Sequence, residues 1–233
     1  MNTHKFCFII CTNNDIYLEE CIHYINHLIV PDGYEIDLIT ISDANSMTEG
    51  YNQGMTSSDA KYKIYMHQDV FILNKHLLFD LLNIFQSDSQ IGMIGMVGCK
   101  RIPPTGMMWH EDRIGNLYTP DTDMMKLSTY RYSLTQDGYE YVSSIDGLFM
   151  ATCRDLPWDA ENLTGWDFYD VFQSMTFLLN GYKIVVPDQI SPWCIHDDKK
   201  VLNLFNYDKY RLIFLEKYKD YLGKNYSDIL KTK

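Results

Sequence analysis

Two short apolar runs separated by an amphipathic stretch open the chain. Residues 6–11 and 36–41 are rich in Phe, Ile and Leu, which is typical of strands buried inside a sheet. Between them, apolar residues from 18 to 29 recur at helical spacing, and Pro31-Asp32-Gly33 ends that pattern. A strand, a helix and a strand in this order predict a βαβ unit, whose parallel strands end at the same edge of the sheet.

Polar residues follow the predicted strands at that edge. Thr12 and Asn13 come after the first strand, before Asn14 or Asp15 as the cap of the helix, and Asp43 comes after the second. Ligands of open α/β sheets bind outside the carboxyl ends of the strands, so these turns are candidates for a binding site.

A third apolar run, over residues 63–73, contains His67-Gln68-Asp69 in its middle. The flanking residues predict one buried strand, on which His67 and Asp69 point to the same face. A buried imidazole and carboxylate need a partner that compensates their desolvation, and one divalent cation could contact both. A purely structural His-x-Asp pair is the alternative.

His196 follows a short predicted strand at 184–187 and lies beside Asp197 and Asp198 in a predicted loop. It could complete a His, Asp, His site for a cation such as Mn²⁺. A solvated surface histidine is the alternative interpretation.

Gly165-Trp166-Asp167-Phe168-Tyr169-Asp170 opens an amphipathic helix predicted over residues 168–180. Carboxylates in a first turn often interact with the helix dipole, which is one interpretation of Asp167 and Asp170. The other is that one of them is a general base beside an aromatic ring that packs on a sugar or an acceptor.

The rest of the chain continues the alternation of strands and helices. A short helix or turn is predicted over 49–58, a helix over 75–86, a strand over 91–97, and strands over 139–144 and 148–153 that flank Asp146-Gly147. Residues 100–138 show no periodicity and are interpreted as a lid or an acceptor-side loop, and a helical tail is expected from residue 201.

Composition narrows the classes of protein. The 233 residues fit one α/β domain. With 20 Lys and Arg against 31 Asp and Glu, the net charge of −11 argues against nucleic acid and an anionic membrane surface, although a nucleotide held through a metal fits. The six cysteines form no C-x-x-C pair, which favours buried free thiols. No apolar run reaches the roughly 18 residues of a spanning helix, so we expect a cytoplasmic protein without a transmembrane segment.

These motifs, taken in order, resemble a known family. Tyr51-Asn52-Gln53-Gly54, His67-Gln68-Asp69, Asp146-Gly147, the 165–170 stretch, Asn180-Gly181-Tyr182-Lys183 and His196 follow one another as in family 2-type glycosyltransferases of GT-A fold. The chain is most similar to the small bacterial branch called glycosyltransferase-like family 2, over roughly residues 5–200.

The resemblance implies a mostly parallel central sheet with helices on both faces in a single GT-A-like domain over residues 1–233. Residues 1–100 would form its nucleotide-binding half, 101–200 its acceptor and catalytic half, and 201–233 a helical tail. It also implies transfer of a sugar from a nucleoside diphosphate sugar, with a UDP-sugar expected, to an acceptor hydroxyl with inversion. The acceptor, whether a glycan, a lipid-linked group or a protein, and the oligomeric state are left open.

The resemblance also suggests roles for single residues. Asp69 occupies the second carboxylate of the family's D-x-D motif, and His67 replaces the first, so with His196 they would bind Mn²⁺ or Mg²⁺. Asp167 stands at the catalytic carboxylate, and Asp170 is the alternative base. Thr12, Asn13 and Asp43 would hold the base and ribose. The other residues implied in donor binding are Asn52, Gln68, Trp166 and, near the transferred sugar, Asp146 and Gly147.

Two other functions compete with this one. A nucleotidyltransferase on a similar sheet needs a glycine-rich, basic loop after the first strand, and residues 12–15 offer neither glycine nor positive charge. A non-catalytic nucleotide- or glycan-binding module is favoured by His67 in place of an aspartate. The tryptophans that are candidates for sugar stacking are Trp109, Trp158, Trp166 and Trp193.

Overall fold

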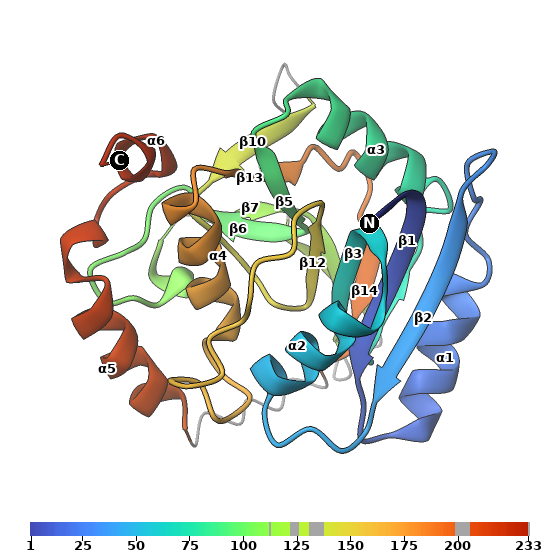
Figure 1. Ribbon diagram of the computed structural model, residues 1–233, viewed down its shortest axis with the longest axis horizontal. Coiled ribbons are helices and arrows are strands. Elements are labelled where there is room, and N and C mark those ends of the chain that lie inside the picture. The colour runs from blue at the N-terminus through green and yellow to red at the C-terminus, as the bar shows by residue number, and fades with distance from the viewer. Residues whose placement is uncertain (112, 122–125, 131–137, 199–205, 233) are drawn as a thin grey trace.

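The structure is a computed structural model that describes residues 1–111, 113–121, 126–130, 138–198 and 206–232. A seven-stranded sheet with strand order β10-β13-β5-β12-β3-β1-β2 forms its centre (Figure 1). The strands of this sheet are β1 (Asn2–Cys11), β2 (Glu35–Ile41), β3 (Ala60–His67), β5 (Ile91–Gly95), β10 (Tyr139–Val142), β12 (Phe149–Thr152) and β13 (Lys183–Pro187).

Five of the seven strands run in one direction. β1 pairs in parallel with β2 and β3, and β13 pairs in parallel with β5. β12 runs antiparallel to its neighbours β3 and β5, and β10 runs antiparallel to β13. The prediction of a mostly parallel central sheet is confirmed, and the carboxyl ends of β1, β2 and β3 meet at one edge, as the βαβ pattern requires.

Side chains of β1 alternate between two apolar layers. Phe6, Phe8 and Ile10 pack with α1 and α3, whereas Cys7 and Ile9 pack with α2 and α4 on the opposite face. Complete burial of one such Phe or Ile side chain contributes about 1.5 to 3 kcal/mol, so both faces need a helical cover. The four helices are α1 (Asp15–Ile25), α2 (Met47–Ser57), α3 (Leu77–Ser87) and α4 (Tyr169–Leu179).

Caps fix where the first two helices begin. The Asn14 side chain accepts hydrogen bonds from the N–H groups of Ile16 and Tyr17, which confirms the prediction that Asn14 or Asp15 caps the helix. Ser46 caps α2 by accepting from the N–H of Glu49. Both helices therefore begin immediately after the polar turns that end β1 and β2.

The run over residues 63–73 is not one strand, which corrects the sequence-based prediction. β3 ends at His67, Gln68 and Asp69 form a turn, and β4 (Val70–Ile72) enters a four-stranded sheet. The reason is long-range pairing, because β4 bonds antiparallel to β14 (Cys194–His196). His196 is therefore the last residue of a strand, and its predicted place in a loop is wrong.

The described part of residues 100–138 contains regular structure, so the prediction of an irregular loop is wrong there. It holds the 3-10 helix η1 (Met108–His110) and the strands β7 (Arg113–Gly115), β8 (Leu117–Asp121) and β9 (Lys126–Tyr130). Strands this short carry too few residues for a visible period. β7 completes a small sheet with β6 (Val97–Cys99) and β11 (Ser144–Ile145). Residues 112, 122–125 and 131–137 of the predicted lid lie outside the described residues.

The C-terminal segment consists of α5 (Tyr207–Lys217), the 3-10 helix η2 (Lys219–Tyr221) and α6 (Tyr226–Leu230). Phe214 and Tyr218 pack against Phe172 of α4, as expected for a tail that packs across the core. Residues 199–205 of the predicted tail lie outside the described residues. Among the helices that the structure describes, none has the length and apolar character needed to cross a membrane.

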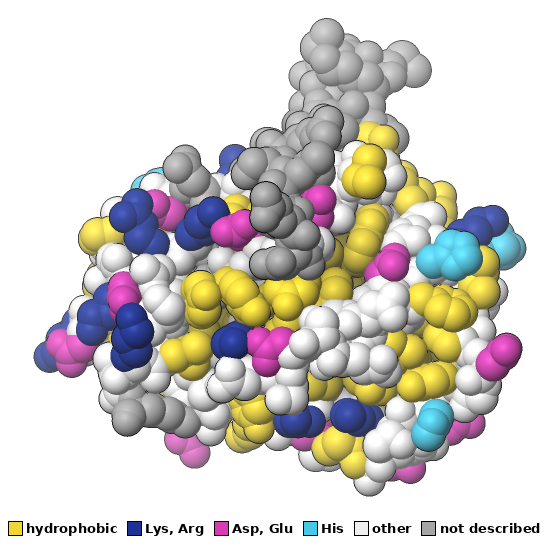
Figure 2. Space-filling view, turned by 90° about the horizontal axis from the view of Figure 1, so that it is seen from above, with side chains coloured by type: hydrophobic (Ala, Val, Ile, Leu, Met, Phe, Trp, Pro, Cys, Tyr) yellow, Lys and Arg dark blue, Asp and Glu magenta, His cyan; other side chains and the backbone are white. Residues whose placement is uncertain are grey.

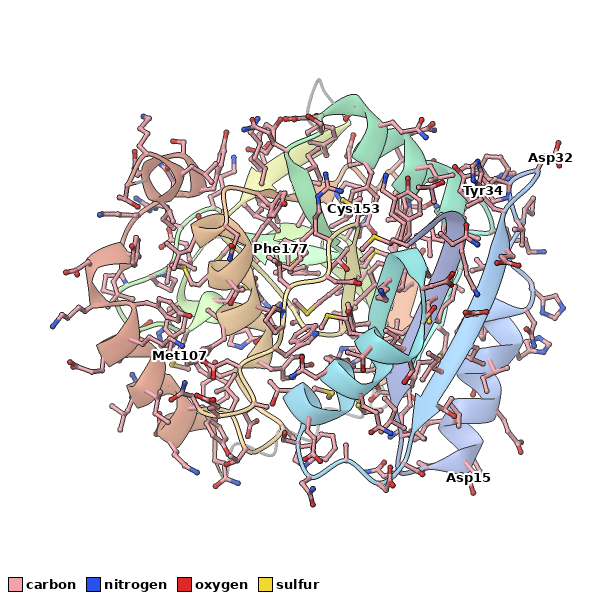
Figure 3. The ribbon with its side chains drawn as sticks, in the orientation of Figure 1. Asp15, Asp32, Tyr34, Met107, Cys153 and Phe177 are labelled. Atoms are coloured by element: carbon pink, nitrogen blue, oxygen red, sulfur yellow. The ribbon has the colours of Figure 1, made fainter. Side chains whose placement is uncertain are left out.

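Most buried side chains are apolar, whereas most charged side chains are exposed or half-buried. All six cysteines are buried and free, which confirms that prediction. Figure 3 shows Cys153 and Phe177 among the interior side chains, whereas Asp15 and Asp32 lie at the periphery. On the face drawn in Figure 2, basic side chains lie beside acidic ones. The structure contains ion pairs between such side chains, for example Lys183–Asp88 at 2.7 Å.

Candidate functional site

A cavity of about 680 Å³ opens at the edge where β1, β2 and β3 end. It lies where open α/β sheets bind their ligands, because the carboxyl ends of parallel strands deliver polar turns there. Most of the residues predicted from the sequence line it. They are Thr12, Asn13, His67, Gln68, Asp69, Trp166 and Asp167.

Three potential metal ligands meet at the rim of this cavity. His67 ends β3, Asp69 lies in the following turn, and His196 ends β14. The pairing of β14 with β4 brings His196 beside this turn, where the N–H of Asp197 donates to the carbonyl of Asp69 at 2.9 Å. One ligand atom from each of the three residues lies within 4.8 Å of the others.

The separations between these atoms suit a shared cation. His67 Nδ1 lies 3.9 Å and His196 Nε2 lies 3.6 Å from the same oxygen, Asp69 Oδ1. Both separations exceed a hydrogen bond. Two atoms bonded to one cation at about 2.1 Å lie about 3 to 4.2 Å apart, which includes both values. Two imidazole nitrogens and a carboxylate oxygen are also a donor set that Mn²⁺ and related ions accept.

The protonation of His67 agrees with a role as a ligand. Desolvation by the surrounding protein and the neighbouring His196 lower the pKa of His67 to about 4, although Asp146 opposes this shift. The imidazole is therefore neutral at pH 7. Only the neutral ring has a lone pair to offer to a metal ion.

Gln68 turns its side chain toward the loop after β1. Its Oε1 accepts hydrogen bonds from Thr12 Oγ1 at 2.7 Å and from the N–H groups of Asn13 and Asn14 at 3.1 and 3.0 Å. Its Nε2 donates to Asn13 Oδ1 at 2.6 Å. The amide of Gln68 therefore holds the loop over residues 12–14 in place at the rim of the cavity.

Asp167 lines the cavity from the segment between β12 and α4. The N–H of Met47 donates to the carbonyl of Gly165 at 3.0 Å, which ties this segment to the start of α2. Trp166 is 50% exposed beside it. Asp167 is half-buried, and burial raises the pKa of its carboxyl above its usual range.

Phe168 separates Asp167 from the helix that follows. Its φ of 66° is in the left-handed region, and no other non-glycine residue of the described chain has a positive φ. This conformation costs about 1 to 3 kcal/mol in general and is offset here by packing of the buried ring against Tyr207 and Phe214. The resulting bend leaves Asp167 at the cavity, while Tyr169 and Asp170 enter α4.

Asp146, Gly147 and Asp170 do not line the cavity, and their polar groups bond within and beside the turn that follows β11. Asp170 accepts from the N–H of Gly147 at 3.0 Å and from that of Val171 at 2.8 Å, and Asp146 accepts from the N–H of Leu148 at 2.9 Å. Burial, with a smaller effect of Asp146, raises the pKa of Asp170 to about 7. These two carboxylates hold the turn between β11 and β12.

Two further predicted residues lie apart from the cavity lining. Asp43 is exposed, although its neighbours Ser42 and Ala44 line the cavity. Asn52 lies in α2, and its amide both donates to and accepts from the backbone of Trp158, at 2.9 Å each. Trp158 itself is a core residue, only 3% exposed.

Several residues of the site carried no sequence signal that singled them out. Tyr169 belongs to the 165–170 stretch, but nothing in that stretch indicates that its hydroxyl bonds to His67 Nε2. Cys11 and Ile41 end the strands whose turns were predicted to bind, so strand ends could have suggested them. The other unpredicted lining residues are Ser42, Ala44, Met47 and Asn206.

Comparison with known proteins defines the class. A model of a family described as "Glycosyltransferase like family" matches residues 7–218. The chain therefore belongs to this family, which confirms the resemblance seen in its motifs, and the family is one of nucleotide-sugar-dependent glycosyltransferases. The search of curated proteins gave no match.

Solved structures of glycosyltransferases share the fold. The mannosyltransferase PcManGT from Pyrobaculum calidifontis, in complex with GDP-Man and Mn²⁺, has a TM-score of 0.59 and 12% identity, covering 99% of this chain and 69% of that one. S. aureus TarS in complex with UDP has a TM-score of 0.56 and 12% identity, covering 97% and 69%. Its complex with UDP-GlcNAc has a TM-score of 0.53 and 11% identity, covering 97% and 70%. The fold is therefore GT-A, as predicted.

Proposed function

We propose that this chain transfers the sugar of a nucleoside diphosphate sugar, expected to be a UDP-sugar, to an acceptor hydroxyl with inversion and with the help of a divalent cation. The observation that carries the proposal is the convergence of His67, Asp69 and His196 at the rim of a cavity that Asp167 also lines. A metal-binding group and a carboxylate of raised pKa at one cavity are the parts that this reaction needs.

His67, Asp69 and His196 would hold the cation. Imidazole ligands suit Mn²⁺ better than Mg²⁺, which prefers oxygen ligands and water. When bound, the cation neutralises negative charge that grows on the departing nucleoside diphosphate. The Mn²⁺ and GDP-Man complex of PcManGT, a protein of the same fold, supports this assignment.

The nucleoside would bind between the ends of β1 and β2. Thr12 and Asn13 line the cavity on one side, with Ser42 and Ala44 on the other. Gln68 holds the loop that carries Thr12 and Asn13, so it would shape this subsite through its hydrogen bonds rather than by touching the base. The UDP and UDP-GlcNAc complexes of TarS support a uridine nucleotide.

Asp167 would act as the general base. Its carboxylate takes the proton of the acceptor hydroxyl as that oxygen attacks the anomeric carbon opposite the leaving diphosphate, which inverts the configuration. Burial raises the pKa of Asp167, which makes its carboxylate a stronger base. Asp170 is the weaker candidate, because its two carboxylate oxygens accept backbone N–H groups away from the cavity.

Nucleotide release from UDP-, GDP- and CDP-sugars, with and without Mn²⁺, tests the proposal. We expect slow, Mn²⁺-dependent hydrolysis of a UDP-sugar that Asp69→Ala and Asp167→Ala abolish. Asp32→Asn, an exposed aspartate in the turn before β2, is the matched control and should keep wild-type rates. Nucleotide binding without turnover, unchanged in Asp167→Ala, would contradict the proposal and indicate a nucleotide- or glycan-binding module.

A further inference from the structure

The two nitrogens of His67 face different partners. Nε2 bonds to the hydroxyl of Tyr169 in α4, whereas Nδ1 faces Asp69 Oδ1 at 3.9 Å. We propose that Tyr169 is a positioning residue, which holds the His67 ring so that Nδ1 is the atom presented to the cation. This inference rests on the proposed cation site and adds a residue that the motif comparison does not assign.

Tyr169 is held firmly enough for this role. Its side chain is 5% exposed and packs against Tyr51, with ring centroids 5.8 Å apart, and against Trp158, at 6.1 Å. On another side lies Gly147, where an added Cβ would overlap the Tyr169 hydroxyl and ring. A ring enclosed in this way has little freedom to rotate, so its hydroxyl is a fixed partner.

The position of this hydroxyl selects one tautomer of His67. A neutral imidazole has one N–H and one lone pair. With Nε2–H donating to the Tyr169 oxygen, the lone pair lies on Nδ1, toward Asp69 and His196. The reverse arrangement would place the N–H on Nδ1, where Asp69 Oδ1 is too distant to accept it. The geometry therefore favours the tautomer that can bind a metal through Nδ1.

The same contacts give Asp146-Gly147 a structural explanation. Glycine at position 147 leaves room for the Tyr169 ring, and Asp170 fixes the turn by accepting the N–H of Gly147 at 3.0 Å. This turn thereby acts on the cation site through Tyr169 and His67, without lining the cavity itself.

Histidine NMR on the metal-free full chain tests the tautomer directly. We expect the ¹⁵N resonances of His67, assigned by their absence in His67→Gln, to show the Nε2–H tautomer in wild type. In Tyr169→Phe, which removes only the hydroxyl, we expect a mixture of tautomers. Tyr218→Phe removes a hydroxyl from another buried ring of the same core and should leave His67 unchanged.

Mn²⁺ titration followed by electron paramagnetic resonance gives a second readout. Loss of an outer partner of a ligating histidine typically weakens metal binding by about 10- to 100-fold, which we expect for Tyr169→Phe and not for Tyr218→Phe. Gly147→Ala, which keeps the hydroxyl but displaces the ring, should act in the same direction. Unchanged tautomers in Tyr169→Phe, or a Mn²⁺ affinity within about twofold of wild type, would overturn the role of Tyr169 alone. Wild-type protein that binds no Mn²⁺ would instead refute the cation site itself.

Discussion

Neighbouring residues of one turn engage different kinds of partner at the rim of the cavity. Gln68 engages both ends of its amide, with four hydrogen bonds of 2.6 to 3.1 Å to the loop after β1. His67 and Asp69, on either side of it, face each other across 3.9 Å through Nδ1 and Oδ1, and His67 bonds through Nε2 to the Tyr169 hydroxyl on its other side.

The carboxylates beside α4 show the same contrast. Asp170 accepts two backbone N–H groups and lies outside the cavity lining, whereas Asp167, three residues earlier, lines the cavity. The bonded set comprises Gln68 and Asp170, whose side chains accept backbone N–H groups of a neighbouring loop or turn. The cavity-facing set comprises His67, Asp69 and Asp167, which line the cavity, and His196, which lies beside Asp69 at its rim. We infer that the bonded set builds the site and that the cavity-facing set performs its chemistry.

The largest difference between the two sets should appear in turnover. Asp167→Asn keeps the size of the side chain but removes the base, so we expect kcat to fall by about 10²- to 10⁴-fold. Nucleotide affinity, measured by calorimetry, should not change. A kcat within threefold of wild type would move Asp167 out of the cavity-facing set.

Metal binding should separate the sets next. His196→Ala removes a proposed ligand. We expect Mn²⁺ affinity to fall by about 100-fold, because loss of even an outer partner of a ligand can weaken metal binding by that much. His76→Ala is the matched control, because His76 is exposed at the start of α3 and makes no capping bond. Equal Mn²⁺ affinity of the two variants would remove His196 from the site.

Gln68→Ala tests the bonded set. The variant leaves the Thr12 hydroxyl and two backbone N–H groups without their acceptor, and we expect about 1 to 2 kcal/mol less unfolding free energy. UDP binding should weaken by about tenfold through loss of loop order, while kcat at saturation stays near wild type. Gln53→Ala, on the exposed face of α2, is the control. A large fall in kcat instead of affinity would contradict a purely architectural role.

Asp170→Asn should have the smallest effect, on the pH dependence of stability. The folded state raises the pKa of Asp170 to about 7, so it binds more protons than the unfolded chain above about pH 4. The stability that protonated Asp170 adds to the folded state is fully present below about pH 4 and is lost as the pH rises through 7. Asp170→Asn should reduce the change in unfolding free energy between about pH 4 and pH 7 by about 1 to 2 kcal/mol, allowing for screening by solvent. Chemical denaturation in the presence of EDTA measures this change. An unchanged slope would show that Asp170 titrates normally.

Local sequence patterns predicted the edge of the sheet at which the site lies. They could not predict the contacts that depend on pairing between distant strands. The alternation of apolar residues in β1 and the cap at Asn14 are encoded within a few residues, so the βαβ unit follows from the sequence alone. The meeting of His196 with Asp69 depends on the pairing of β14 with β4, which joins segments more than a hundred residues apart and leaves no local signal.

The partners of buried polar side chains could also not be predicted from the sequence. Lys63 lies fully buried in β3, where its ammonium group bonds to both carboxylate oxygens of Asp155 at 2.8 and 2.7 Å. Nothing in the apolar run around Lys63 indicates that partner. In the same way, the sequence suggested that Gln68 binds the donor, but the direction of its side chain depends on the loop after β1.

The linkage between Mn²⁺ and UDP tests the central claim most directly. Calorimetric titration of UDP, with and without Mn²⁺, should show at least about tenfold tighter binding with the cation, or 1.4 kcal/mol, in wild type. In Asp69→Ala, Mn²⁺ should make no difference to UDP affinity. Equal UDP affinity with and without Mn²⁺ in wild type, or the same tightening in Asp69→Ala, would contradict a cation held by His67, Asp69 and His196.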